Sequence, residues 1–283
     1  MTFYSPLRYP GGKAKLSKYF KKLILENNLK GGTYVEIYAG GASIALSLLI
    51  EGYVSEIRIN DNDQSIYALW HSILNHPRKI CKLIEKTPLT VESWKRQKEI
   101  QKDKENQNLL ELGFSTLFLN RTNRSGIINA GVIGGLSQKG NWKMDARFNK
   151  ENLISKIKLI SKYKNKIKIY NEDAVKLVNR IKNRLPKKSL IYLDPPYYVK
   201  GKELYMNYYE HKDHEVIAKM IRAVTKYKWI VTYDDVGPIN KLYKGFDNYS
   251  HLLNYSAANS GQGREIIIFS RSMKHFPEGL LLA

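Results

Sequence analysis

Cysteine is nearly absent from this 283-residue sequence, which contains one thiol, Cys81. A single cysteine can form neither an intramolecular disulfide nor a cysteine-based zinc cluster, and this suits a reducing cytoplasm. The longest apolar run, residues 44–50, is far too short to span a bilayer. The first residues lack the basic stretch and apolar core of a secretory signal. We therefore expect a cytoplasmic protein without a membrane segment.

Acidic residues are also scarce. The chain has 26 Asp and Glu against 47 Lys and Arg, which gives a net charge of +21 and a pI of about 9.7. Nucleic acid is the usual partner of such a surplus, because binding to phosphates releases condensed counterions. A proteome rich in lysine would raise the pI without any polyanion, so the charge by itself leaves both explanations open.

Metal and phosphate-loop patterns are missing as well. The six histidines show no convincing metal-ligand spacing, and His211 with His214 is more typical of a solvated helix start. Gly11-Gly12-Lys13 lacks the preceding strand, the spacing and the following hydroxyl residue of a nucleotide-binding P-loop. The sequence therefore predicts no metal.

What the sequence does contain is an alternation of apolar strands and helices. Strands are expected at 34–38, 56–60, 167–170, 189–193, 229–233 and 265–269. Several end in acidic or small residues, as in a doubly wound α/β sheet. Between 65 and 164 no strand is evident. We expect an α/β domain formed by 1–64 and 165–283, with a mostly helical insertion at 65–164 that contains an exposed helix at 94–111 and a glycine-rich loop at 121–142.

The first expected strand ends in a turn of small residues that opens a helix, where such sheets bind nucleotides. Gly40 and Gly41 allow the backbone to approach a ligand closely, and Asp61 follows the next strand, as expected of an acid that binds ribose hydroxyls. The turn lacks the dinucleotide fingerprint, so a nucleoside without phosphates is favoured. A tight strand–helix turn with no ligand is the alternative.

The sharpest motif is Asp194-Pro195-Pro196-Tyr197, directly after an apolar strand. Two prolines can neither extend a central strand nor fill a helix interior, so they form a stiff segment at the end of the strand. The Asp194 carboxylate and the Pro195 carbonyl could accept both hydrogens of an amino group, and Tyr197 could stack on a heterocycle. A proline-rich turn with a solvated aspartate is the alternative.

Three segments in this order resemble the Dam-type family of adenine-specific DNA methyltransferases: 9–13, 36–42 and 194–197. The resemblance extends over nearly the whole chain, from about Pro6 to Phe269. It implies a Rossmann-like S-adenosylmethionine-dependent methyltransferase sheet with a helical DNA-recognition insertion. It also implies methyl transfer to the N6 amine of adenine in double-stranded DNA, with the target base flipped out of the helix.

The resemblance assigns a role to individual residues. The catalytic motif corresponds to Asp194, Pro195, Pro196 and Tyr197. Cofactor binding is expected of Tyr9, Lys13, Glu36, Tyr38, Ala39, Gly40, Gly41, Ala42, Ser43, Asp61, Asp173 and Asp194. DNA binding is expected of Asn120, Arg121, Asn123, Arg124, Ser125, Lys139 and Lys143, and the sequence does not choose between base and phosphate contacts for the two arginines.

Two departures from the family pattern are Ala42, where glycine is usual, and Ile37, where proline is frequent. An inactive DNA-binding module of the same fold is therefore kept as an alternative, beside methylation of RNA or of a cytosine amine. The recognition sequence, a cognate restriction endonuclease and the oligomeric state are left open.

Overall fold

The computed structural model describes residues 3–8, 16–199, 209–254 and 262–276. The chain divides into two compact units. A helical unit comprises 1–12 and 61–171, and a sheet unit comprises 13–60 and 172–283. The predicted boundaries of the insertion, 65 and 164, fall inside the helical unit.

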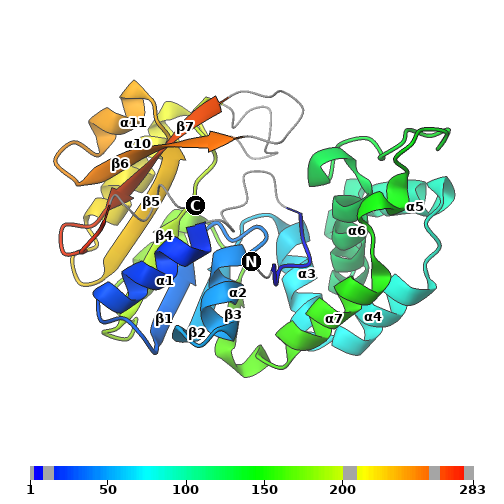
Figure 1. The fold of residues 1–283 in the computed structure, drawn as a ribbon, viewed down its shortest axis with the longest axis horizontal. Coiled ribbons are helices and arrows are strands. Elements are labelled where there is room, and N and C mark those ends of the chain that lie inside the picture. Colours follow the sequence, from blue (N-terminus) through cyan, green and yellow to red (C-terminus); the bar gives the residue numbers. More distant parts are fainter. Residues whose placement is uncertain (1–2, 9–15, 200–208, 255–261, 277–283) are drawn as a thin grey trace. The chain divides into compact units, whose positions relative to one another are not determined.

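The described elements follow one another along the chain, and most are labelled in Figure 1. They are α1 (Ser17–Glu26), β1 (Gly32–Glu36), α2 (Ser43–Ile50), β2 (Val54–Asn60), α3 (Gln64–Asn75), α4 (Pro77–Lys86), α5 (Val91–Lys102), α6 (Leu109–Thr122), α7 (Lys150–Ser161), β3 (Ile167–Tyr170), α8 (Ala174–Ile181), β4 (Ser189–Leu193), α10 (His211–Arg222), β5 (Lys228–Asp234), α11 (Gly237–Leu242), β6 (Asn248–Asn254) and β7 (Gln262–Phe269).

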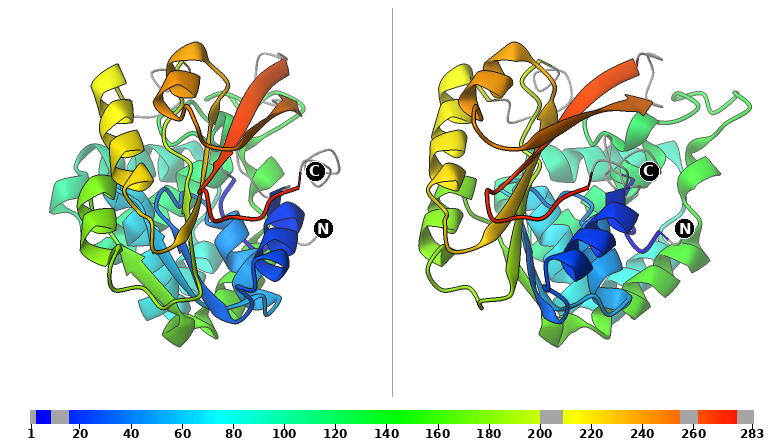
Figure 2. Two further views of the ribbon diagram at one scale, coloured as in Figure 1. Left: turned by 90° about the vertical axis from the view of Figure 1, so that its left-hand side faces the viewer. Right: turned by 60° about the vertical axis from the view of Figure 1, so that its left-hand side comes forward.

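Seven strands form one sheet in the order β3-β2-β1-β4-β5-β7-β6. β1 pairs in parallel with β2 and β4, and β4 pairs in parallel with β5, whereas β7 is antiparallel to β5 and β6. Every residue of β1 and β4 is buried, as expected of central parallel strands covered on both faces. Figure 2 shows α1 on one face of the sheet and α10 on the other. The predicted α/β sheet is confirmed.

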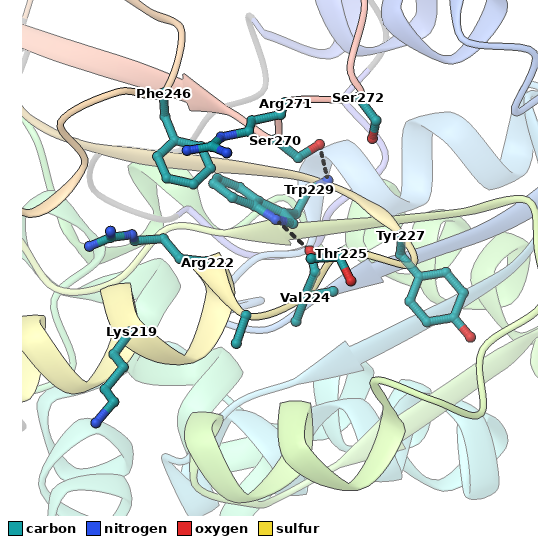
Figure 3. A pocket seen from close by; sticks show the side chains of 11 residues that line it. Lys219, Arg222, Val224, Thr225, Tyr227, Trp229, Phe246, Ser270, Arg271 and Ser272 are labelled. Atoms are coloured by element: carbon teal, nitrogen blue, oxygen red, sulfur yellow. Dashed lines mark hydrogen bonds between the residues drawn. The ribbon is translucent and has the colours of Figure 1, made fainter.

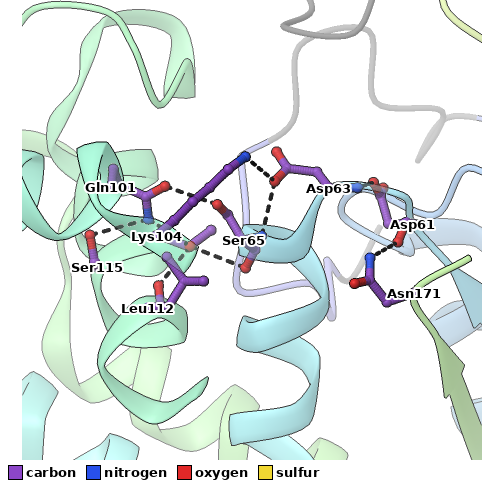
Figure 4. Close-up of polar contacts among 9 residues, drawn as sticks. Asp61, Asp63, Ser65, Gln101, Lys104, Leu112, Ser115 and Asn171 are labelled. Carbon is purple, nitrogen blue, oxygen red and sulfur yellow. Dashed lines mark hydrogen bonds and ion pairs between the residues drawn. The ribbon is translucent and has the colours of Figure 1, made fainter. Parts of the chain in front are cut away.

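The helical unit is organised around α6, which is buried from Leu112 to Asn120 and packs against α3 and α5. Polar contacts join these helices (Figure 4). The Gln101 amide nitrogen lies 3.2 Å from Ser115 Oγ and 3.0 Å from Thr116 Oγ1, while Ser65 Oγ donates to Gln101 Oε1 at 2.9 Å. Because these polar groups are paired, they can be buried at little cost.

The prediction of one helix over 94–111 was wrong. α5 ends at Lys102, a 3-10 turn follows at 104–106, and α6 begins at Leu109. The Asn108 side chain accepts from the N–H groups of Leu110 and Glu111, at 3.1 and 3.0 Å, and so caps a new helix. An asparagine followed by an apolar run is the signal that could have located this boundary.

Gly113 of α6 packs directly against the backbone of α3. A Cβ at this position would be 2.5 Å from the Ala68 carbonyl oxygen and 2.7 Å from Ser72 Oγ. We expect Gly113→Ala to lower the free energy of unfolding by about 1–3 kcal/mol despite the higher helix propensity of alanine. Urea denaturation measures this. In the control variant Gly237→Ala, the new Cβ meets no atom within 4 Å, so the free energy of unfolding should stay unchanged. Equal stability of the two variants would contradict the close contact.

Candidate functional site

The direction of the Asp194 carboxylate depends on a hydrogen bond from β5. Thr232 Oγ1 donates to Asp194 Oδ1 at 2.6 Å, and the Tyr192 hydroxyl lies 2.8 Å from Thr232 Oγ1. Since the single proton of the threonine hydroxyl goes to the carboxylate, the tyrosine must donate to the threonine. Thr232 is fully buried and Tyr192 nearly so. A chain of two hydroxyl groups therefore orients Asp194 from within the core.

The Tyr192 ring is itself held by neighbouring aromatic rings. Its centroid lies 4.9 Å from that of Phe20, with an edge-on interplanar angle of 72°, and 6.5 Å from that of Tyr34, with an angle of 25°. Rings in such buried, offset arrangements have little freedom to turn. The position of the Tyr192 hydroxyl is thus fixed by packing.

Other side chains hold the end of the motif and the two residues that follow it. Asp234 accepts from the backbone N–H of Tyr198 at 2.8 Å and from that of Val199 at 2.9 Å. The Tyr197 hydroxyl donates to Glu265 of β7, and the Tyr197 residue is 2% exposed. The predicted stacking of Tyr197 on a purine stays a prediction, and it would require the ring face to be uncovered when a base enters.

The turn after β1 has the backbone shape of a close ligand approach. Gly40 and Ala42 have φ angles of 44° and 46°. The left-handed conformation costs about 1–2 kcal/mol for a residue with a Cβ, which explains why glycine would be favoured at position 42. Ala42 is buried, and its N–H donates to the Ala39 carbonyl at 2.6 Å. The alanine is accommodated, so this departure gives no support to an inactive module.

Asn60, which the sequence analysis missed, connects three strand ends. Its side-chain nitrogen donates to the carbonyls of Ile37 and Glu172 at 3.0 and 2.9 Å, and its side-chain oxygen accepts from the Glu172 N–H at 3.0 Å. Its own carbonyl accepts from the Ala39 N–H at 2.8 Å. A buried asparagine at a strand end, directly before Asp61, is the signal that could have identified it.

Glu36 is a buried carboxyl group beside this turn. It is 5% exposed and accepts from the Ala45 N–H at 3.1 Å. Burial raises the pKa of Glu36 to about 8, and the nearby Asp194 charge adds to the effect. Tyr38, also expected at the cofactor, has its hydroxyl 3.2 Å from that of Tyr209, and burial raises its pKa.

The other residues expected at the cofactor have local roles in the fold. Asp61, in the helical unit, accepts from the Asp63 N–H at 3.0 Å. Asp173, in the sheet unit, accepts from the Lys176 N–H at 3.0 Å and caps α8. Both are partly exposed, and cofactor contact remains a prediction for each. Tyr9 and Lys13 lie outside the described residues.

Two of the residues predicted to bind DNA are buried. Asn120 and Asn123 are 2% and 0% exposed. The Asn120 side chain donates to the carbonyls of Arg8 and Gly126, at 2.7 and 2.8 Å. The Asn123 side chain accepts from Trp94 Nε1 at 2.6 Å and donates to the carbonyl of Ile128 at 2.8 Å. Asn120 lies within α6 and Asn123 directly follows its last residue, and the hydrogen bonds of both side chains hold the loop.

The surface of the same loop carries cations. Arg124, Lys139 and Lys143 are exposed, and Ser125 is partly exposed with a φ of 55°. The loop also carries Trp142, which is 71% exposed and which the sequence analysis did not select. A tryptophan beside a lysine in a glycine-rich loop is a signal that could have found it.

Residues 9–256 match the profile of a protein family described as D12 class N6 adenine-specific DNA methyltransferase. The chain belongs to this family. The match confirms the resemblance given by the three motifs, and S-adenosylmethionine is the methyl donor expected of the family. A search of curated protein sequences found no match to this methyltransferase.

Solved structures give more distant likenesses. A SAM-dependent methyltransferase from Agrobacterium tumefaciens is 8% identical, with a TM-score of 0.42 over 91% of this chain and 61% of that protein. The rRNA methyltransferase aviRa from Streptomyces viridochromogenes is 9% identical, with a TM-score of 0.37 over 89% of this chain and 84% of that one. This methyltransferase thus spans less than two thirds of the length of the Agrobacterium protein.

A cavity of about 480 Å³ lies elsewhere in the sheet unit of the methyltransferase, at the amino end of β5 (Figure 3). Its walls include Lys219, Arg222 and Arg271, and none of its lining residues is acidic. The guanidinium groups of Arg222 and Arg271 lie 5.7 and 5.2 Å from the Phe246 ring centroid. Asp194 follows the opposite end of the neighbouring strand β4, so this cavity is separate from the catalytic motif.

Within the described ranges, no helix has the length and apolar character needed to cross a membrane. The same residues contain no group of three side chains suited to bind a metal ion.

We expect the raised pKa of Glu36 to make stability depend on pH. The folded state keeps the proton up to about pH 8, whereas the ordinary pKa is 4.5, so the folded protein binds more protons in this window. Stability should therefore fall as pH rises between these values, and Glu36→Gln should remove that slope. Thermal unfolding of the cofactor-free protein across this range measures it. Glu26→Gln, at an exposed position, is the control, and parallel curves for wild type and Glu36→Gln would contradict the assignment.

Proposed function

We propose that Asp194 and the Pro195 carbonyl bind the N6 amine of an adenine extruded from double-stranded DNA. The hydrogen bond from Thr232 to Asp194 carries this proposal, because it gives the carboxylate one direction at the end of β4. The adenine amine is a poor nucleophile, since its lone pair is delocalised into the purine ring. Two fixed acceptors for its hydrogens would localise that lone pair and orient it for attack.

The residues around the turn after β1 fit the methyl donor. Gly40 and Ala42 have the left-handed backbone that brings main-chain groups close to a ligand. The buried Glu36 keeps its proton in the free protein, and a bound cation would favour its ionised form. When bound, S-adenosylmethionine supplies a methyl group on a sulfonium ion, and no metal is needed for the transfer. Asp194 need not be a strong base, because the product ammonium can lose its proton to water.

An adenine inside a duplex cannot reach a strand-end pocket, so we propose that the base is flipped out at a cost of about a few kcal/mol. The exposed Arg124, Lys139 and Lys143 would hold the DNA, and the exposed Trp142 would contact sugars or bases. This activity and the reduced Cys81 support a location in a reducing cytoplasm.

Changing Asp194→Ala should abolish methyl transfer and leave cofactor binding nearly intact, because it removes an acceptor for the adenine amine. Tritium transfer from labelled S-adenosylmethionine to adenine-containing and adenine-free duplexes measures the first, and calorimetric titration with the cofactor measures the second. Asp194→Asn, which keeps the shape but adds a donor, should be similarly inactive. Full activity of either variant, or equal labelling of the adenine-free duplex by the wild type, would refute the mechanism.

Thr232 is expected to act as a positioning residue for Asp194. Thr232→Val keeps the shape and removes the hydroxyl, so kcat should fall about tenfold to a hundredfold, as for the loss of a hydrogen bond to a charged group. KM for DNA and the cofactor Kd should change little. Thr232→Ser retains the donor and should restore most of the rate. A Thr232→Ser variant as slow as Thr232→Val would show that the methyl group, not the hydroxyl, matters.

A further inference from the structure

Four cationic side chains of the helical unit are grouped around the segment Ser5–Arg8: those of Arg8, Arg121, Arg147 and Lys156. Arg121 Nε donates to the Pro6 carbonyl at 2.6 Å, and Lys156 Nζ donates to the Ser5 carbonyl at 3.1 Å. One side chain of α6 and one of α7 therefore donate hydrogen bonds to neighbouring carbonyls of the same short segment. We refer to these four residues as the cationic cluster.

The charges of the cationic cluster are not neutralised within the described part of the chain, where no acid forms an ion pair with any of the four. Burial and the neighbouring Arg8 lower the pKa of Arg121 to about 10. Burial together with Arg147 lowers the pKa of Arg8, and burial together with Arg121 lowers that of Lys156. These neighbouring cations therefore repel one another.

Arg8 also has an unsatisfied donor. Its Nη1 atom is buried and has no hydrogen-bond partner. Its backbone is fixed by Asn120, which accepts from the Arg8 N–H at 2.8 Å and donates to its carbonyl at 2.7 Å. Gly126 packs so closely that a Cβ there would be 2.5 Å from the Arg8 carbonyl oxygen. A buried guanidinium nitrogen without a protein partner requires an explanation, and a bound anion would supply the missing acceptor.

We propose that the cationic cluster binds backbone phosphates of the target DNA. This assignment rests on the proposed function, and it extends that function to Arg8, Arg147 and Lys156. A phosphate offers both the negative charge that offsets the mutual repulsion and the acceptors that arginine N–H groups match. The edge of a guanine is neutral and would leave the repulsion in place, so the cluster favours phosphate over base contacts for Arg121.

A purely structural role is the competing explanation, because Arg121 and Lys156 also hold Ser5 and Pro6 in place. Neutral donors could hold two carbonyls without gathering four positive charges. The two explanations differ in one measurable quantity. Phosphate contacts make DNA affinity depend on salt, with a slope of log K against log salt of about −0.9 per contact.

The test measures that slope by fluorescence anisotropy with two labelled duplexes of equal length, one containing adenine and one built only of guanine and cytosine. Arg147→Gln is the main variant, because Arg147 is exposed and its loss should spare the fold. Arg121→Gln is the second, with thermal unfolding as a check on folding. Lys241→Gln, at an exposed position on α11, is the matched control. All are made in the Asp194→Ala background, so binding is measured without turnover.

We expect Arg147→Gln and Arg121→Gln each to reduce the magnitude of the slope by about 0.9. Each variant should also bind both duplexes more weakly, by the same factor for the two. An unchanged slope, with or without a loss of stability, overturns the proposal. A loss confined to the adenine-containing duplex also overturns it, because that result would indicate base reading. If the slopes change as expected while the wild type transfers no methyl group, the proposed function fails and the phosphate site stands.

Discussion

A carboxylate can hold a substrate amine only if it points in one direction before the substrate arrives, and in this protein buried core residues set the direction of Asp194. Phe20 and Tyr34 fix the Tyr192 ring, Tyr192 fixes the Thr232 hydroxyl, and Thr232 fixes the carboxylate. Each step uses a group that is buried. The packing that stabilises the sheet therefore also holds the Asp194 carboxylate in place.

The two units differ in the charged groups that they bring together. In the sheet unit, Glu36 and Asp194 bring acids together, and burial keeps Glu36 largely protonated at neutral pH. In the helical unit, Arg8, Arg121 and Lys156 bring cations together without a matching acid among the described residues. Like charges raise the free energy of each group unless a ligand of opposite sign is bound. This unbalanced arrangement favours a cationic ligand near Glu36 and a polyanion at the helical unit.

The sheet and the place of the Asp194-Pro195-Pro196-Tyr197 motif at the end of a strand could be predicted from the sequence because their signals are local. An apolar strand followed by Asp194-Pro195-Pro196-Tyr197, and a strand followed by Gly40 and Gly41, each fix a position in the fold. The partners of these residues could not be predicted, since Thr232 and Glu265 reach the motif only through strand pairing far along the chain. The burial of Asn120 and Asn123 could not be predicted either, because no local sequence pattern shows that these two polar side chains face inward.

The exposure of Trp142 gives this protein an optical property of its own. Among the tryptophans, Trp70 and Trp229 are buried and Trp94 donates from its indole to Asn123, whereas Trp142 is 71% exposed. An indole in water emits at longer wavelength and is open to collisional quenchers, while the buried rings are not. The red edge of the intrinsic emission therefore reports mainly on the loop that carries Trp142, and a ligand that covers this indole would shift the emission and protect it from quenchers.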